Sequence, residues 1–501
     1  MVGLHLIKLK MKRAIIILIT FISALTFSRA QTIDEALWYS QLFYGGTARF
    51  QAMGGAFTAL GGDLSVLSQN PAGLGVYRSM ELSFSPQVYY NNSLTSYNNT
   101  ESNDYAYRFN LNQAGFVFPL VSNGNSSGLS GLNFAYSYNR TNNFNANALI
   151  RGVNNNSSMA DYWADIANGI SYTELDGAPG AAFEVWVIDT LEGSGGFDYA
   201  TTFSQYGENT NSTYGQSVRR IITREGHAGE HAFSVSANMG HKFYIGATIG
   251  INKISSFSTY EHTETDNQDL IFDFNNFSYR DVVETSGTGY SFKIGAIFKP
   301  IDMLRLGFAF HTPTIYRLDE YYYDDIRSEF DNGDNYTWEN DPFRFRYTLT
   351  TPLRAMAGAA VQLGKSGMIS ADYEFIDYRM ARFSRASDGY SYDFENQDIK
   401  DIYDVAHNLR IGGELRMNAL YLRAGYAIYG SPFVKGEDNE DNTQSVYSAG
   451  LGLRQKNFSF DISYALRSSN QMYFMYNHPE INPADIQYNR HMVTATLGFR
   501  F

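Results

Sequence analysis

After residue 81, the connections between predicted strands alternate between very short turns and long polar segments. Five connections are only two or three residues long: Gly240-His241, Pro300 to Asp302, Gly364 to Ser366, Met417-Asn418 and Lys456-Asn457. The long polar segments between them include 256–287, 312–345, 378–405 and 468–489. A soluble sandwich has no reason to collect its long loops at one end, whereas a membrane-spanning barrel has short turns at one rim and long loops at the other.

The alternation of side chains within these segments fits strands with lipid on one face and a polar lumen on the other. In the last segment, 490–501, Val493 and Leu497 share one face while Thr494 and Thr496 share the other. The predicted strands are 81–90, 109–118, 131–138, 229–239, 242–255, 288–299, 303–311, 352–363, 367–377, 406–416, 419–429, 445–455, 458–467 and 490–501. We therefore predict an all-β fold, a transmembrane antiparallel barrel of about fourteen strands. An even strand number puts all five short turns on the periplasmic side.

Composition excludes several other classes of protein. The net charge is −13, with 51 acidic and 38 basic residues, so a basic face for nucleic acid is not expected. Cysteine is absent, which removes disulfides, thiol catalysis and cysteine metal sites. The aromatic fraction of 16% fits girdles at the two membrane interfaces. We expect no cofactor and no metal.

Two segments precede the predicted barrel. Basic residues, the apolar run 14–27 and the small residues 28–30 predict a signal peptide, 1–30, with the mature chain beginning near Gln31. Segment 31–80 is rich in glycine and in small apolar residues, and apolar side chains such as Phe50 and Phe57 would be costly to expose. We predict that 31–80 forms a hatch inside the lumen of a barrel spanning 81–501.

The largest predicted outer insertion is 139–228. Within it, residues such as Trp163 and Ile166 follow a helical apolar spacing. This stripe either anchors the loop against the barrel rim or forms an apolar landing groove for a ligand.

The sequence also contains one motif of metal chemistry. His227 to His231 matches the H-x-x-E-H pattern of inverted zinc peptidases, but Gly229 interrupts it and a strand-like alternation follows. We also find no serine elbow and no phosphate-binding glycine loop. The chain is not expected to be an enzyme.

Several segments resemble the long-chain fatty-acid outer-membrane transporter family (FadL/TodX-like). They occur in the family's order and cover the hatch and much of the barrel. These segments are 52–60, 70–74, 311–316, 409–415, 422–432, 448–453 and 460–464.

The resemblance implies a fourteen-stranded barrel in the bacterial outer membrane and diffusive uptake of hydrophobic molecules past a hatch. The ligand would be captured by outer loops, would move to a lumen pocket and would leave sideways through a gap in the wall. Residues Asn70, Pro71, Ala72 and Gly73 match the hatch motif, where they would either gate that route or shape the hatch.

The predicted lumen face carries charged residues that bear on the ligand. Arg410 and Arg423 could pair with an anionic head group, because guanidinium pairs well with carboxylate. Alternatively they pair with Glu414 or with lumen water.

Three functions remain open at this point: passive uptake of a hydrophobic or amphipathic small molecule, a barrel that shuttles protein cargo in type IX secretion, and a structural or adhesive porin. Expected partners are the small-molecule ligand, outer-membrane lipid and, through the C-terminal strand ending at Phe501, the barrel-assembly machinery. Bound amphiphile would favour uptake, whereas a stoichiometric protein partner would favour the shuttle.

Overall fold

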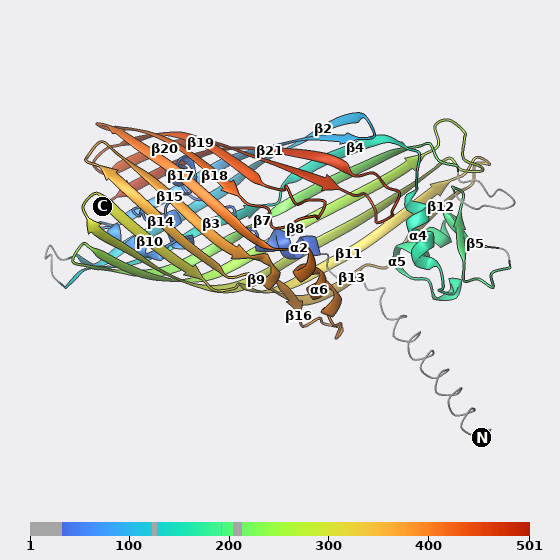
Figure 1. Cartoon of the computed structure of the whole chain (residues 1–501), viewed down its shortest axis with the longest axis horizontal. Coiled ribbons are helices and arrows are strands. Elements are labelled where there is room, and N and C mark those ends of the chain that lie inside the picture. The colour runs from blue at the N-terminus through green and yellow to red at the C-terminus, as the bar shows by residue number, and fades with distance from the viewer. Residues whose placement is uncertain (1–32, 123–127, 192, 204–212) are drawn as a thin grey trace, which may run out of the picture.

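A closed antiparallel barrel of 14 strands encloses residues 33–77 (Figure 1). The computed structural model describes residues 33–122, 128–191, 193–203 and 213–501. The predicted signal peptide, 1–30, lies outside the described residues. The barrel closes where β21 pairs with β1.

Pairing runs in sequence order around the wall. The wall strands are β1 Glu81–Tyr97, β2 Thr100–Ser122, β3 Leu129–Asn143, β7 Gln216–Met239, β8 Phe243–Thr265, β9 Asn276–Ile301, β10 Leu304–His311 continued by β11 Ile315–Glu329, β13 Phe343–Thr350 continued by β14 Arg354–Leu363, β15 Gly367–Asp377 continued by β16 Arg382–Ser384, β17 Val405–Met417, β18 Leu420–Tyr429, β19 Gln444–Arg454, β20 Phe458–Tyr473 and β21 Ala484–Arg500. Pro313 and Pro352 lie at two of the interruptions, because proline cannot donate to a ladder.

The remaining elements lie in the connections and at the N-terminus. They are β4 Ala146–Asn154, β5 Ile188–Thr190, β6 Tyr199–Thr201, β12 Asn335–Glu339, α2 Ile33–Ser40, α3 Ala48–Ala52, α4 Met159–Ala167, α5 Gly177–Glu184, α6 Asp393–Ile402 and the 3-10 helices η1 Leu64–Ser68, η2 Pro71–Val76, η3 Tyr172–Glu174 and η4 Tyr378–Met380. No helix among the described residues is long and apolar enough to cross a membrane.

All fourteen predicted strands are present, but many extend further outward than predicted. The polar segment 91–108 is the tip of a hairpin between β1 and β2, which turns at Asn98 and Asn99. Much of 256–287 likewise belongs to β8 and β9. Backbone pairing continues beyond the membrane, where the lipid no longer imposes alternation of apolar side chains. The outer insertion is therefore 155–215, shorter than the predicted 139–228.

The outer surface of the wall carries a continuous apolar band. On β17, Leu409 and Ile411 are 54% and 49% exposed, while Arg410 between them is 2% exposed and faces the lumen. Apolar side chains directed outward and charges directed inward are the pattern of a barrel surrounded by lipid. Together with the closed 14-strand architecture, this pattern places the protein in the bacterial outer membrane.

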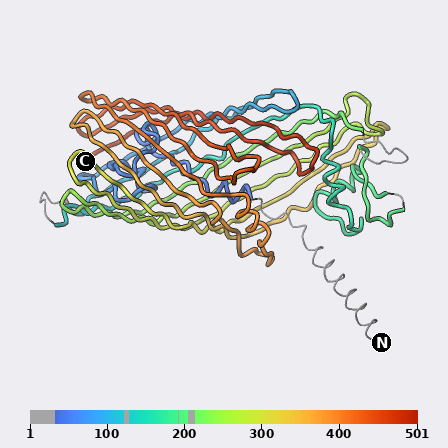
Figure 2. The backbone as a smooth tube through the Cα atoms, viewed as in Figure 1, coloured from blue at the N-terminus to red at the C-terminus, as the bar shows by residue number. Residues whose placement is uncertain are grey.

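The hatch, residues 33–77, lies inside the barrel, as the blue trace in Figure 2 shows. Wall glycines make room for it: a Cβ at Gly295 would collide with the side chain of Asn70, and one at Gly246 with Pro71. The other wall glycines in close contact with the hatch are Gly307, Gly358, Gly412, Gly425 and Gly450. Glycine at these wall positions therefore allows the hatch to approach the wall closely.

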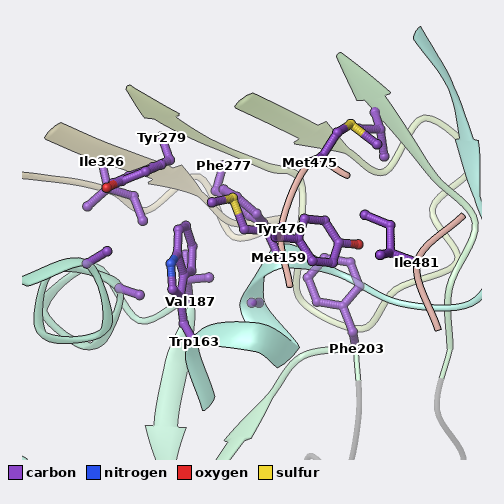
Figure 3. Packing of buried hydrophobic residues seen from close by; sticks show 14 of the residues in the cluster. Met159, Trp163, Val187, Phe203, Phe277, Tyr279, Ile326, Met475, Tyr476 and Ile481 are labelled. Carbon is purple, nitrogen blue, oxygen red and sulfur yellow. The ribbon is translucent and has the colours of Figure 1, made fainter. Parts of the chain in front are cut away.

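At the opposite end from the short turns, the described elements of the insertion, α4, α5, β5 and β6, form a lid at the outer end of the barrel (Figure 1). Trp163 of α4 is fully buried and packs against Phe277 and Tyr279 of β9 (Figure 3). Glu264 of β8 accepts hydrogen bonds from Ser158 Oγ at 2.7 Å and from Met159 N at 2.8 Å, which fixes the start of α4. The lid is docked by both apolar packing and a buried carboxylate.

Candidate functional site

The hatch motif at 70–73 lies against the wall formed by β8 and β9. Asn70 caps η2 by accepting from Ala72 N at 3.1 Å, and Pro71 occupies the first helical position. Asn70 Nδ2 donates to Thr58 O at 2.6 Å and to Ala296 O of β9 at 3.3 Å. The motif thereby joins two parts of the hatch to the wall, and gating by residues 70–73 stays a prediction.

The arginines predicted on the lumen face are held in buried ion pairs. Arg423 Nε lies 2.6 Å from Glu414 Oε2, and its Nη1 lies 2.6 Å from Asp461 Oδ1. Arg49 of the hatch shares the same Glu414 at 2.9 Å. Glu414 therefore bridges two cations and links the hatch to the wall.

Arg410 belongs to a second cluster of buried ion pairs. Its guanidinium contacts Glu374, which Arg354 also contacts at 3.0 Å. Arg354 donates further to Ser40 O at the end of α2. Ligand contact by Arg410 or Arg423 stays a prediction, and in the structure both contribute to the support of the hatch.

Two small adjoining cavities, of about 60 and 100 Å³, also lie in the lumen. The inner cavity includes Tyr44, Tyr89 and Tyr429 in its lining, and the outer cavity includes Trp38 and Tyr488. The residues lining both are Phe43, Asn142, Asn143 and Arg467. Aromatic rings with dispersed polar groups are the usual lining of a small-molecule site.

The cavities also contain guanidiniums that differ from those of the ion pairs. Arg140, Arg224, Arg467 and Arg490 line them, and none of the four has an ion pair among the described residues. Arg467 lies over the ring of Phe43 at 3.9 Å and Arg224 over that of Trp38 at 3.8 Å. Arg467 Nε is buried without a hydrogen-bond partner. The cavity walls are therefore cationic as well as aromatic.

Asp34 of α2 is the carboxylate that lines the outer cavity. Burial raises the pKa of Asp34, and the charge of Arg224 opposes this rise. Asp34 and three arginines, Arg224, Arg467 and Arg490, line this cavity together.

The wall beside the inner cavity contains a break in its ladder. The last β2–β3 pair on the outer side is Gln113 with Asn139; beyond it β2 pairs only with β1, and β3 only with β7. The hatch covers the separated edge of β3 from inside, as Phe43 N donates to Thr141 O at 2.8 Å. Sheet pairing between β2 and β3 thus ends well within the length of β2.

A recess on the outer surface lies at this break. Its volume is about 690 Å³, and its lining includes Phe84, Leu111 and Tyr138. Arg140 lines both this recess and the inner cavity, and its Nε donates to Leu111 O at 3.4 Å. The Arg140 side chain therefore lies between the inner cavity and the lipid-facing recess, beside the hatch backbone that covers β3.

The two predicted lid residues are not part of the cavities. Trp163 is fully buried in the lid core and Ile166 is half-buried on the same helix, which supports the anchoring role predicted for the stripe. Ligand contact by either residue stays a prediction.

The zinc-like motif lies in strand β7. Alternation directs His227 and His231 outward and Glu230 inward, where it contacts Lys293. The residues of this motif do not converge on one point.

Sequence reasoning missed the four cavity arginines. They lie outside the segments that resemble the transporter family, in strand positions predicted as loop or not assigned a role. The alternation of side chains in the predicted strand 458–467 places Arg467 on the lumen face, so this residue could have been identified from the sequence. Arg224 could be identified only if β7 were known to begin at Gln216.

No family model and no curated protein sequence matches the chain. Among solved structures, a Pseudomonas aeruginosa FadL homologue superposes with a TM-score of 0.54 at 12% identity, covering 92% of this chain and 100% of that one. The Pseudomonas putida toluene transporter TodX gives a TM-score of 0.52 at 12% identity, with the same coverage. The chain therefore has the fold of the FadL/TodX-like outer-membrane transporters, with a hatch inside a closed barrel of 14 strands.

Proposed function

We propose that the protein mediates passive uptake of amphipathic small molecules that have an anionic head group, of the long-chain fatty-acid type. One observation carries this proposal: two adjoining aromatic cavities in the lumen are lined by four guanidiniums without ion pairs, and the inner cavity reaches Arg140 at the break between β2 and β3. Rings accept the apolar part of such a molecule, and guanidinium pairs with its carboxylate.

The route follows from the arrangement of the cavities. A ligand in the outer cavity would be held by Arg224 and Arg490, would pass Arg467, and would reach Arg140 at the side of the barrel. Displacement of the Arg140 side chain would join the inner cavity to the recess, so that the ligand leaves sideways past Leu111. The hatch would then close the straight path without having to move.

The similar structures support the transport class but differ in the chemistry of their cargo. TodX is described as a toluene transporter, and toluene has no charge. The guanidiniums in this lumen favour a charged amphiphile, because an anionic head group forms charge-assisted hydrogen bonds with them and an uncharged hydrocarbon cannot.

Native mass spectrometry on the purified full chain tests this proposal. The protein would be incubated with equimolar dodecanoate and dodecanol, which share their apolar chain and differ in the charge of the head group. We expect retained dodecanoate in clear excess over dodecanol. Equal retention would contradict the anionic class, and an empty barrel with a stoichiometric protein partner would favour a shuttle for protein cargo.

A further inference from the structure

Three histidines lie on the lipid-facing surface of the barrel, and each is paired with a tyrosine. Tyr136 Oη lies 2.8 Å from His231 Nδ1, and Tyr373 Oη lies 2.7 Å from His407 Nδ1. The third pair, Tyr464 and His491, is separated by 2.8 Å. Three of the nine histidines of the chain therefore share one arrangement on one surface.

The geometry of the three pairs is the same. In each case the tyrosine lies on the strand that runs outward from a periplasmic turn, and the histidine lies on its neighbour that runs back. The tyrosine is not the residue directly opposite the histidine. It lies two residues nearer to the periplasmic turn on the same strand, so each pair is diagonal. A second ring also lies beside each imidazole: Tyr138, Phe375 and Tyr90.

The pairs mark the level at which the surface changes from apolar to polar. On β21, Val493 and Phe499 face lipid on the periplasmic side of His491, while Asn489 and Gln487 follow on its outer side. On the periplasmic side of the other two histidines the exposed residues are likewise apolar: Phe233 and Val235 on β7, and Leu409 and Ile411 on β17. This transition is where the acyl chains of the outer leaflet end and the lipid head groups begin.

The hydrogen bond within each pair determines what the imidazole offers to the lipid. We assign the tyrosine hydroxyl as the donor, because it has no acceptor other than Nδ1 among the described residues, and in that arrangement the neutral imidazole carries its proton on Nε2. No protein group among the described residues accepts from Nε2 of His231, His407 or His491. Each pair thus presents one oriented donor at the level of the head groups.

We propose that these three Tyr–His pairs form a belt that binds the phosphate of lipid head groups in the outer leaflet. Phosphate supplies strong acceptor oxygens, and a nearby anion also stabilises the protonated imidazole. The aromatic rings hold each imidazole at a fixed depth, so the belt both binds a lipid class and sets the position of the barrel in the membrane. The inference does not depend on the cargo proposed above.

A lipid-retention experiment with the full chain tests the belt. The probes are phosphatidic acid and diacylglycerol with identical acyl chains, which differ only in the phosphate, and native mass spectrometry measures how much of each stays bound. The variant combines His231→Gln, His407→Gln and His491→Gln. The control is His241→Gln, which alters a histidine of a periplasmic turn that is bonded to Asn238.

We expect the unmodified chain and the control to prefer phosphatidic acid, and the triple variant to lose about fivefold or more of that preference, as expected for charge-assisted bonds at an exposed site. Circular dichroism would show intact β-structure in the triple variant, because the three side chains lie on the surface. An unmodified chain without preference, a triple variant that keeps the full preference, or competition by millimolar inorganic phosphate that removes lipid selectivity would each overturn the proposal.

Discussion

Replacement of Arg467 and Arg490 together, by Gln at both positions, is expected to weaken dodecanoate binding by about 3 kcal/mol, or roughly a hundredfold, because each guanidinium contributes a charge-assisted bond. Binding of dodecanol should change much less, because it depends on the aromatic walls. Isothermal titration calorimetry of both ligands would measure the two affinities. Neither arginine has an ion pair among the described residues, so no carboxylate loses its partner and the fold should remain intact.

Arg219→Gln is the matched control for this double variant. Arg219 is on β7, its side chain is 45% exposed and lies 3.6 Å from Glu261, and it does not line either cavity. It should leave both affinities unchanged. If the double variant bound dodecanoate as tightly as the unmodified chain, the cavity arginines would not be the head-group site.

Replacement of Glu414 by Ala is expected to have the largest effect on the hatch. Glu414 pairs with Arg49 of the hatch and with Arg423 of the wall, and its loss would leave two buried cations without that partner. Breaking a buried pair in this way costs about 3–5 kcal/mol. The cost falls on hatch attachment, so limited proteolysis should cleave within residues 33–77 and planar-bilayer conductance should rise.

Glu261→Ala removes a carboxylate of the same type from an exposed pair and serves as the control. Exposed pairs contribute about 0–1 kcal/mol, so this variant should resist protease and conduct as the unmodified chain does. A protected, non-conducting Glu414→Ala barrel would show that the ion pairs do not hold the hatch.

The barrel could be predicted from sequence because lipid imposes a strict rule on each strand. Charges such as Arg410 cannot face the membrane, so the alternation of side chains alone assigns Leu409 and Ile411 to the outside. Short turns then fix the periplasmic rim. The hatch was recognisable because its glycines and apolar side chains fit an enclosed segment, although nothing in sequence indicated which wall glycines receive it.

The outer half of the barrel and the cavity arginines could not be predicted in the same way. Beyond the membrane, strands such as β8 continue with polar residues on both faces, so the periodic signal disappears while the backbone pairing does not. Whether Arg467 has a carboxylate partner depends on contacts between distant strands and the hatch. The break between β2 and β3 likewise depends on where β2 stops pairing with β3, and the sequence contains no signal for the end of that pairing at Asn139.

The sideways route is tested most directly by mapping where a photoreactive ligand lies. A dodecanoate with a diazirine in its chain would be bound to the protein in outer-membrane vesicles, irradiated and located by peptide mass spectrometry. We expect labels on Phe43 and Tyr429 in the cavity and on Tyr138 in the outer recess. Labels on Val76 and Arg78, which precede β1 at the periplasmic rim, with none in the recess, would contradict it and indicate passage straight through the hatch.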